Sequence, residues 1–335
     1  FENTIEDTNK DWLKRIINEY YNPTPVETIP NELINYFEYL KDHKKSEITV
    51  STEKKYNTIK ALLKKFETST NKKFLIKDVN ENFKKAFEDF CNKNQYSHNT
   101  IARALRSIKT ICKHAQHNGI EVSHQLDGLK AKYKKTDNIY LSFEDLNTIE
   151  VIEPSKLTES LNNAKDWLII SCYTGQRVSD FMKFNKDQIR IEDGKHLLEF
   201  TQKKTNKNMT IPIHKKVLEI LEKRNGHFPK PISDQKYNDY IKKVCEIAEL
   251  NEIVKGGKKT ETAPESKIYR KEVKEFEKWE LVTSHIGRRS FASNFYGTIP
   301  TTFLIYVTGH STEKMFLNYI GKSNKDLALE LTKYF

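Results

Sequence analysis

The sequence predicts a mainly α-helical protein of the α+β class, in which a helical bundle precedes a mixed domain with a small three-stranded antiparallel sheet. Its 335 residues exceed what one hydrophobic core usually holds, so about two domains are expected. Apolar residues recur at helical spacing through most of the chain. The segment 188–213 has the short apolar stretches and turn residues that indicate the strands of the sheet.

Composition restricts the possible partners. The chain has 57 Lys and Arg against 46 Asp and Glu, and its net charge of +11 favours an anionic partner such as nucleic acid. A Lys-rich composition alone would give the same excess, so charge is weak support. No apolar run approaches the ~20 residues of a membrane span. We therefore expect no membrane partner and a soluble, cytoplasmic protein. The four cysteines have neither metal-site nor disulfide-framework spacing and should be reduced and buried: Cys91, Cys112, Cys172 and Cys245.

The first 30 residues predict one helix and a linker. Residues 8–21 carry Trp12, Ile16 and Ile17 at helical spacing, and the following Asn-Pro-Thr-Pro ends that helix. The linker is expected to run to about Pro30. Residues 1–30 therefore form a segment of their own ahead of the first domain.

Residues 31–129 predict a bundle of four amphipathic helices. Asn31 should open the first, and Ser51 should cap the second. The third contains Phe83, and Ser97 should cap the fourth. Two of these helices have a basic face opposite the apolar stripe, with the residues Lys54, Lys55, Lys60, Lys64, Arg103, Arg106, Lys109 and Lys113. Such faces suit DNA phosphates, although solubility is the commoner reason for a Lys-rich helix face.

Residues 130–138 are polar, charged and without apolar periodicity, which predicts a hinge. The second domain then spans residues 139–335. It should begin with a short helix, because Ser142 with an Asp three residues later forms a near capping box.

An apolar helix over residues 164–174 is expected to end at Gly175. Arg177 follows directly, so a buried helix would hold an arginine at its end, with Asp180 one turn further on to orient a neighbouring cation. On local grounds a structural role for this arginine is equally reasonable.

Three short antiparallel strands are predicted at residues 188–191, 196–201 and 209–213. Asp-Gly makes the first turn, and a basic segment with Lys203 and Lys204 makes the second. A hairpin tip of this kind can hold an ammonium group beside a phosphate, although most basic turns are simply solvated. The segments that follow are two amphipathic helices and an exposed loop or hairpin insertion, at residues 215–225, 233–248 and 253–279.

The C-terminal part holds the residues best suited to chemistry. Thr283 or Ser284 can cap a helix, so that His285 and Arg288, three residues apart, project from one turn. Taken singly, such a pair is usually a solvated helix face.

Two further candidates follow in the sequence. Pro300 begins and Gly309 ends a short helix, which places His310 just beyond it. Tyr319 lies nine residues later, on another short helical stretch. Because guanidinium groups bind phosphate and imidazole moves protons near neutral pH, the set with Arg288 suits a tyrosine hydroxyl that attacks a phosphodiester.

In this order and spacing the motifs resemble those of tyrosine recombinases of the phage and transposon integrase family, including integrases of Bacteroidetes-type mobile elements. The resemblance runs from about residue 31 to the end of the chain. The residues that match the family's motifs are Arg177 in Thr-Gly-x-Arg, Asp180, Lys204 with Lys203 as its rival, His285 and Arg288 in His-x-x-Arg, His310 in Gly-His, and Tyr319.

The resemblance implies a site-specific recombinase that needs no cofactor or metal. Tyr319 would attack the scissile phosphate and form a 3'-phosphotyrosyl link, for integration or excision of a mobile element, while His285 accepts or positions the tyrosine proton. Arg177 and Arg288, with His310, would stabilise the transition state. Lys204 would protonate the leaving 5'-oxygen.

The resemblance also implies partners. These are double-stranded DNA attachment sites, three further copies of the chain in a tetramer on DNA, and accessory factors that bend DNA or set direction. The C-terminal tail, through Leu327 and Leu331, is expected to dock on a neighbouring protomer. The basic helix faces would then contact DNA, residues 1–30 would follow an arm-binding domain upstream of Phe1, and the protein would be nucleoid-associated.

Three other classes stay open on the residues alone. A type IB topoisomerase shares the Arg, Lys, His and Tyr chemistry but relaxes DNA without strand exchange. A catalytically idle DNA-binding regulator would use the same basic surfaces. A metal-dependent nuclease is least favoured, because no Asp, Glu and His set has the spacing of metal ligands.

Overall fold

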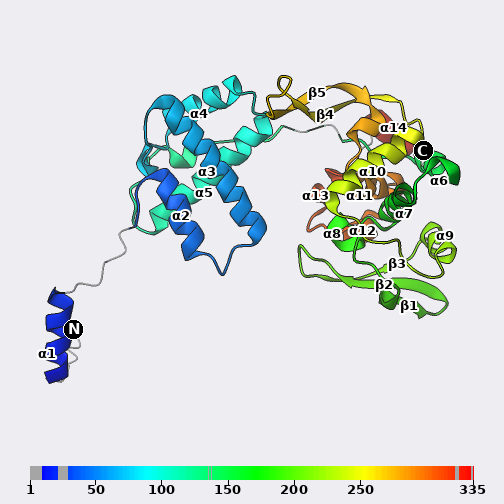
Figure 1. The fold of residues 1–335 in the computed structure, drawn as a ribbon, viewed down its shortest axis with the longest axis horizontal. Coiled ribbons are helices and arrows are strands. Elements are labelled where there is room, and N and C mark those ends of the chain that lie inside the picture. Colours follow the sequence, from blue (N-terminus) through cyan, green and yellow to red (C-terminus); the bar gives the residue numbers. More distant parts are fainter. Residues whose placement is uncertain (1–9, 22–28, 135, 137, 321–323, 333–334) are drawn as a thin grey trace. The chain divides into compact units, whose positions relative to one another are not determined.

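The computed structural model describes residues 10–21, 29–134, 136, 138–320, 324–332 and 335. The chain forms two compact units, Phe1–Lys134 and Lys135–Phe335 (Figure 1). The boundary between them falls within the segment 130–138. An additional helix, α1 (Lys10–Tyr21), lies near the N-terminus, and its Tyr20 and Tyr21 are exposed. None of the described helices is long and apolar enough to cross a membrane.

Unit 1 is the predicted bundle of four helices. They are α2 (Leu33–His43), α3 (Val50–Thr70), α4 (Glu81–Lys93) and α5 (His98–His117). Ser97 caps α5, as predicted. Two predicted starts are wrong. Thr49 rather than Ser51 caps α3, because its hydroxyl accepts the Thr52 N–H, and α2 begins after Glu32 rather than at Asn31.

The core of unit 1 is built around Phe66, which is fully buried. Its ring stacks on Phe74 with centroids 5.1 Å apart and meets Phe87 edge-on at 5.3 Å. Cys91 and Cys112 also lie in this core. All four cysteines are free and buried, as predicted, and burial raises the pKa of each thiol.

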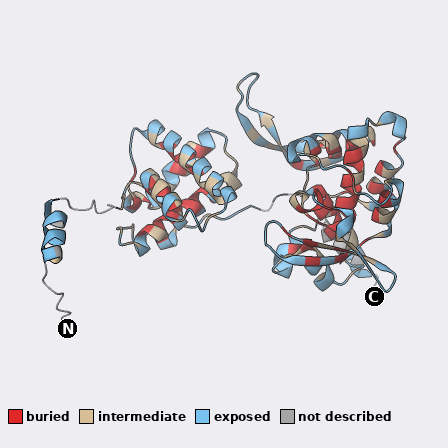
Figure 2. Cartoon of the chain, turned by 60° about the horizontal axis from the view of Figure 1, so that its bottom comes forward, coloured by how far each residue is buried: buried red, intermediate tan, exposed pale blue. Residues whose placement is uncertain are grey.

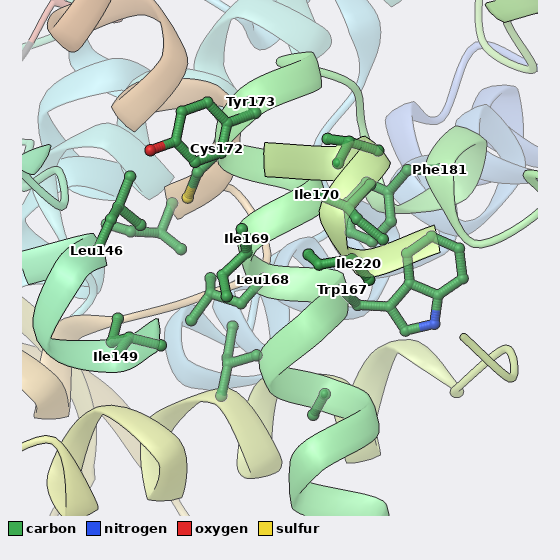
Figure 3. Close-up of a cluster of buried hydrophobic side chains, with 14 of the residues drawn as sticks. Leu146, Ile149, Trp167, Leu168, Ile169, Ile170, Cys172, Tyr173, Phe181 and Ile220 are labelled. Atoms are coloured by element: carbon green, nitrogen blue, oxygen red, sulfur yellow. The ribbon is translucent and has the colours of Figure 1, made fainter. Parts of the chain in front are cut away.

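Unit 2 is organised around α7 (Glu159–Thr174). Ten of its residues from Ala164 onwards are buried, so the helix is covered on all sides, and Trp167 packs between Phe181 and Phe228 (Figures 2 and 3). The other helices of the unit are α6 (Phe143–Glu150), α8 (Val178–Phe181), α9 (Lys215–Lys223), α10 (Asp234–Ile247), α11 (Ile286–Phe295), α12 (Thr301–Thr308), α13 (Glu313–Leu317) and α14 (Asn324–Leu331). Ser142 and Asp145 form the predicted capping box of α6.

The predicted antiparallel sheet is confirmed. It consists of β1 (Ile189–Glu192), β2 (Lys195–Thr201) and β3 (Asn208–Pro212) in the order β1-β2-β3. Leu198 pairs with Ile211, and both side chains are buried in the core of unit 2. The register therefore turns the apolar face of the sheet inward.

The segment 253–279 is a hairpin rather than an open loop. Its strands are β4 (Ile253–Glu261) and β5 (Tyr269–Glu277), which pair along their full length. Lys278 fixes the base of this hairpin, with its ammonium group 2.7 Å from Asp145 and 2.9 Å from Glu252.

Candidate active site

The C-terminal end of α7 places Arg177. Gly175 ends the helix with φ of +65°, and a Cβ at that position would lie 2.6 Å from the Phe291 ring. Only glycine fits both the backbone angle and the contact. The chain then turns, so that Arg177 precedes α8 with its side chain about four-fifths buried, as the exposed fraction of 18% indicates.

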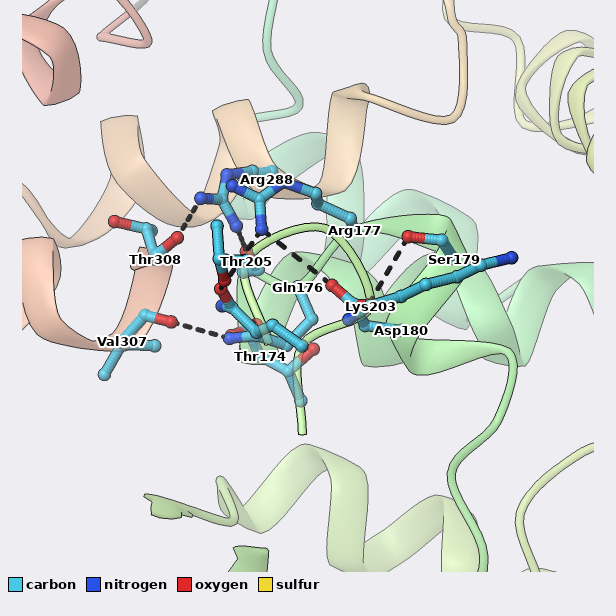
Figure 4. Close-up of polar contacts among 12 residues, drawn as sticks. Thr174, Gln176, Arg177, Ser179, Asp180, Lys203, Thr205, Arg288, Val307 and Thr308 are labelled. Atoms are coloured by element: carbon cyan, nitrogen blue, oxygen red, sulfur yellow. Dashed lines mark hydrogen bonds and ion pairs between the residues drawn. The ribbon is translucent and has the colours of Figure 1, made fainter. Parts of the chain in front are cut away.

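Arg288 lies on α11 and is 1% exposed. Its guanidinium donates to the carbonyl of Gly175 at 3.0 Å and to the carbonyl of Thr308 (Figure 4). Desolvation, and then the charge of Arg177, lowers the Arg288 pKa to about 10, so the side chain stays protonated at neutral pH. The two carbonyls fix the guanidinium plane, while Nε is buried and has no hydrogen-bond partner among the described residues.

His310 and Tyr319 lie against Arg288. Gly309 ends α12 with φ of +62°, and His310 Nδ1 contacts the Thr308 hydroxyl at 2.8 Å. The Tyr319 ring centroid is 4.6 Å from that of His310 and 5.8 Å from the Arg288 Cζ atom. The predicted helical position of Tyr319 is wrong. The residue follows α13 in a turn, because the helix ends at Leu317 and Asn318 caps it.

His285 is the N-cap of α11, a position that we expected Thr283 or Ser284 to occupy. The His285 pKa is lowered, first by desolvation and then by the charges of Arg289, Arg288, Arg177 and Lys204. Lys204 makes the last of these contributions.

Lys203 and Lys204 lie in the turn between β2 and β3, not on the strands themselves. The N–H of Lys203 donates to Asp180 Oδ1 at 2.9 Å, and its ammonium group points away from the two arginines in Figure 4. Asp180 is 4% exposed and lies 3.9 Å from Arg177. The carboxylate thus fixes the turn as well as facing an arginine.

The electrostatics of this site favour an anion. Burial, and then the charges of Arg288 and Arg177, lowers the His310 pKa to about 4, so the imidazole is neutral at pH 7. A phosphate placed beside these groups would offset the cationic charge that now disfavours imidazolium. The arrangement can therefore hold a phosphodiester next to a tyrosine hydroxyl.

Two buried glutamines, Gln176 and Gln202, also contact this site, and we did not predict them from the sequence. They are 1% and 0% exposed. Gln176 lies inside the Thr-Gly-x-Arg motif and Gln202 two residues before Lys204. Position beside a motif was the only available signal, because a glutamine in a turn is usually solvated.

In unit 1, a groove between α3 and α5 brings together some of the predicted DNA-binding residues. It has a volume of about 550 Å³, and the predicted residues Lys54, Lys55 and Arg103 line it together with Lys65. Lys60 instead forms an ion pair with Glu38.

The other basic residues of α5 contact the chain that follows it. Arg106 donates to the Ala131 carbonyl at 2.7 Å, and Lys109 to the Asp127 carbonyl at 2.7 Å. Lys113 lies 2.5 Å from the Asp127 carboxylate. His98 similarly contacts the Lys132 carbonyl at 2.8 Å. The first residues of the predicted hinge are therefore held on α5, and these cations have a structural role. Their contact with DNA stays a prediction.

The fold, with a cationic site beside a tyrosine, is that of a DNA strand transferase of the tyrosine type. Residues 32–147 match the model of the phage integrase SAM-like domain, and residues 149–325 match that of the phage integrase family. The second match covers more than half of the chain, so this protein belongs to the phage integrase family and is a tyrosine-type site-specific DNA recombinase. No curated protein matches the chain.

Solved structures share the fold at low sequence identity. The Tn1549 transposon integrase in complex with transposon right end DNA is 14% identical, with a TM-score of 0.62, over 90% of this chain and 99% of that one. A lambda integrase dimer bound to a COC' core site is 17% identical, with a TM-score of 0.64, over 87% and 96%. A lambda integrase tetramer bound to a Holliday junction is 15% identical, with a TM-score of 0.60, over 92% and 84%.

Proposed function

We propose that Tyr319 is the nucleophile of this recombinase and that Arg177, Arg288 and His310 bind the scissile phosphate. The observation that carries the proposal is the position of the Tyr319 ring, beside His310 and over the Arg288 guanidinium. A phosphate bound by the two arginines would lie close to the tyrosine hydroxyl. Positioned cations of this kind stabilise the added negative charge of the transition state.

The reaction balances with the groups present. A bond forms between the tyrosine oxygen and phosphorus, and the bond from phosphorus to the 5'-oxygen breaks. The tyrosine proton passes to His285, whose lowered pKa keeps it neutral and able to accept. Lys204 gives a proton to the leaving 5'-oxygen. Rejoining reverses these steps with the 5'-hydroxyl of another strand, so the bond energy is retained.

The choice of Lys204 over Lys203 as general acid rests on two features. Lys204 matches the family's hairpin lysine ahead of the Ile-Pro strand, and its charge contributes to the lowered His285 pKa. The Lys203 backbone is bound to Asp180, and its side chain points away from the arginines. Lys203 is then left to contact DNA outside the reacting phosphate.

A suicide duplex tests the nucleophile. The protein is incubated with a nicked duplex that carries its attachment site, and we expect a covalent complex on a denaturing gel. Tyr319→Phe should bind the same DNA with unchanged affinity and give no adduct, because only the nucleophilic oxygen is removed. An adduct that persists in this variant would refute the assignment.

The substrate surfaces and the assembly are part of the same proposal. The groove lined by Lys54, Lys55 and Arg103 would contact phosphates of the attachment site. Four copies would assemble on two sites, with accessory factors that bend DNA or set the direction of exchange.

We further propose that the tail docks on a neighbouring protomer. Leu329 and Leu331 of α14 are 59% and 53% exposed on their own chain, and Phe335 is 98% exposed. The side chain of Leu327, predicted to act with Leu331, lies outside the described residues. An apolar groove of about 630 Å³ in unit 2 offers an acceptor for such side chains, lined among others by Tyr173, Ile211, Phe291, Phe295, Phe303 and Tyr306.

A further inference from the structure

Two glutamine side chains link parts of the site that are far apart in the sequence. Gln176 and Gln202 are almost completely buried, and burial of a primary amide is costly unless its hydrogen bonds are made. Each of these amides has partners on both its oxygen and its nitrogen. Their contacts therefore show what the pair holds in place.

The Gln202 oxygen joins Arg177 to the β2–β3 turn. Gln202 Oε1 accepts from Arg177 Nη1 at 3.3 Å and from the Thr205 hydroxyl at 2.8 Å. The Gln202 main chain also closes the turn, since its N–H donates to the Lys207 carbonyl at 2.9 Å and its carbonyl accepts the Asn206 N–H at 2.9 Å. The Gln202 side-chain oxygen thus binds both Arg177, which we propose binds the phosphate, and the turn that carries Lys204.

The Gln202 nitrogen extends the link to α12. Gln202 Nε2 donates to Gln176 Oε1 at 3.3 Å, and Gln176 Nε2 donates to the carbonyls of Thr174 at 2.9 Å and Val307 at 2.8 Å (Figure 4). The orientation of both amides follows from these partners, because each oxygen faces a donor and each nitrogen an acceptor. Thr308, the residue after Val307, accepts from Arg288 and contacts His310.

A close contact supports this link. A Cβ at Gly309 would lie 2.8 Å from both polar atoms of the Gln202 amide. The backbone just before His310 therefore rests directly on the Gln202 side chain. Only a glycine, which also provides the positive φ at this position, allows that approach.

We propose that Gln202, with Gln176, is a positioning residue that holds the turn bearing Lys204 in register with Arg177 and with the end of α12. This inference rests on the proposed role of Lys204 as general acid. The turn itself is exposed on its outer side, from residue 203 to residue 207. Two side chains tie the turn to Arg177: Asp180 accepts the Lys203 N–H, and Gln202 accepts the Thr205 hydroxyl. The Asp180 contact holds the fold of the turn, so loss of the Thr205–Gln202 bond should displace Lys204 more than it destabilises the fold.

The test uses the complete chain and two suicide substrates, one with a normal 5'-oxygen and one with a 5'-bridging sulfur, which needs little protonation on leaving. Thr205→Val keeps the shape of the side chain and removes the hydroxyl. We expect it to slow cleavage of the normal substrate between about tenfold and a hundredfold, as displacement of a catalytic group does. The sulfur substrate should restore its rate to that of the unchanged protein.

Gln202→Met removes the hydrogen bonds to Thr205 and to Arg177 and should cleave both substrates slowly. The sulfur substrate should restore only part of the lost rate, because Arg177 is released as well. Gln235→Met, at an exposed position on α10, is the matched control and should cleave both at the normal rate. Melting temperatures are measured for all variants. If Gln202→Met does not fold, Thr205→Val still decides the question.

Two results would overturn the inference in distinguishable ways. Suppose that the sulfur substrate restores cleavage by Lys204→Ala. If Thr205→Val then cleaves the normal substrate at the unchanged rate, or loses rate equally on both substrates, the positioning role of Gln202 is wrong, while Lys204 stands as the general acid. If sulfur does not restore Lys204→Ala, the general-acid assignment fails and the inference falls with it.

Discussion

Gly287 sets how closely α11 approaches α7, and its replacement by alanine should disturb both stability and catalysis. A Cβ at this position would lie 2.5 Å from the Ser171 Cβ and 2.9 Å from the Ser171 carbonyl carbon. Carbon atoms pack at about 3.5–4.0 Å, so the helices must separate by roughly 1 Å. Arg288 is the next residue on α11, and its partner Gly175 ends α7, so this separation acts directly on the two arginines.

The expected magnitude follows from two opposing effects. Overpacking of this kind costs about 1–3 kcal/mol, while glycine to alanine inside a helix gains up to about 1 kcal/mol. Because the contacts are this short, we expect the upper end of the overpacking cost. The net loss in free energy of unfolding is then about 2 kcal/mol. For a unit of this size that corresponds to a fall in melting temperature of roughly 4–8 °C. Displacement of Arg288 by about 1 Å should slow suicide-substrate cleavage by up to about a hundredfold.

Thermal denaturation and single-turnover cleavage measure both effects. Gly128→Ala is the control, because a Cβ there has no atom within 4 Å, and it should leave both quantities close to their normal values. Ser171→Gly added to Gly287→Ala removes the side chain in the way and should raise the cleavage rate above that of the single variant. If Gly287→Ala melts at or above the normal temperature and cleaves at the normal rate, the reasoning is wrong.

Three further predictions concern protons and assembly. Lys204→Ala should slow cleavage far more than Lys203→Ala, and a 5'-bridging sulfur should restore it; equal losses in single-turnover assays would contradict the choice of general acid. The folded state holds the His310 pKa near 4, below its usual 6.5, so the free protein should lose stability as the pH falls from 6.5 to 4. A bound phosphate should raise the His310 pKa, and DNA affinity should therefore increase as the pH falls over the same range. Binding titrations at constant ionic strength should show a flatter pH dependence for His310→Asn, and an identical slope would exclude this group. Leu329→Ala with Leu331→Ala should leave melting and single-site binding unchanged, because both side chains are exposed, but weaken synapsis of two sites in a gel-shift assay; unfolding of the variant would show that the tail belongs to its own core.

The sequence alone determined the class, the sheet and the order of the site residues. Local signals carried these predictions: the buried α7 ended by Gly175, the Asp-Gly turn before β2, and the Gly309 that ends α12 before His310. Each depends on neighbouring residues only, because backbone angle and helical periodicity are local properties. Helix starts were less well predicted, since several residues at each start can accept the same N–H group, as Thr49 rather than Ser51 does for α3.

Only the tertiary structure decided how the site is connected. Arg288 is fixed by the Gly175 and Thr308 carbonyls, and Gln202 binds Arg177. Each of these contacts joins residues at least 20 positions apart. The tertiary structure also decided that Lys109 bonds to the chain after α5 and that Lys54 lines a groove, although both lie on predicted basic faces. The physical reason is that hydrogen bonding and desolvation act through space. A polar side chain has the same appearance in the sequence whether its partner is water or a distant carbonyl.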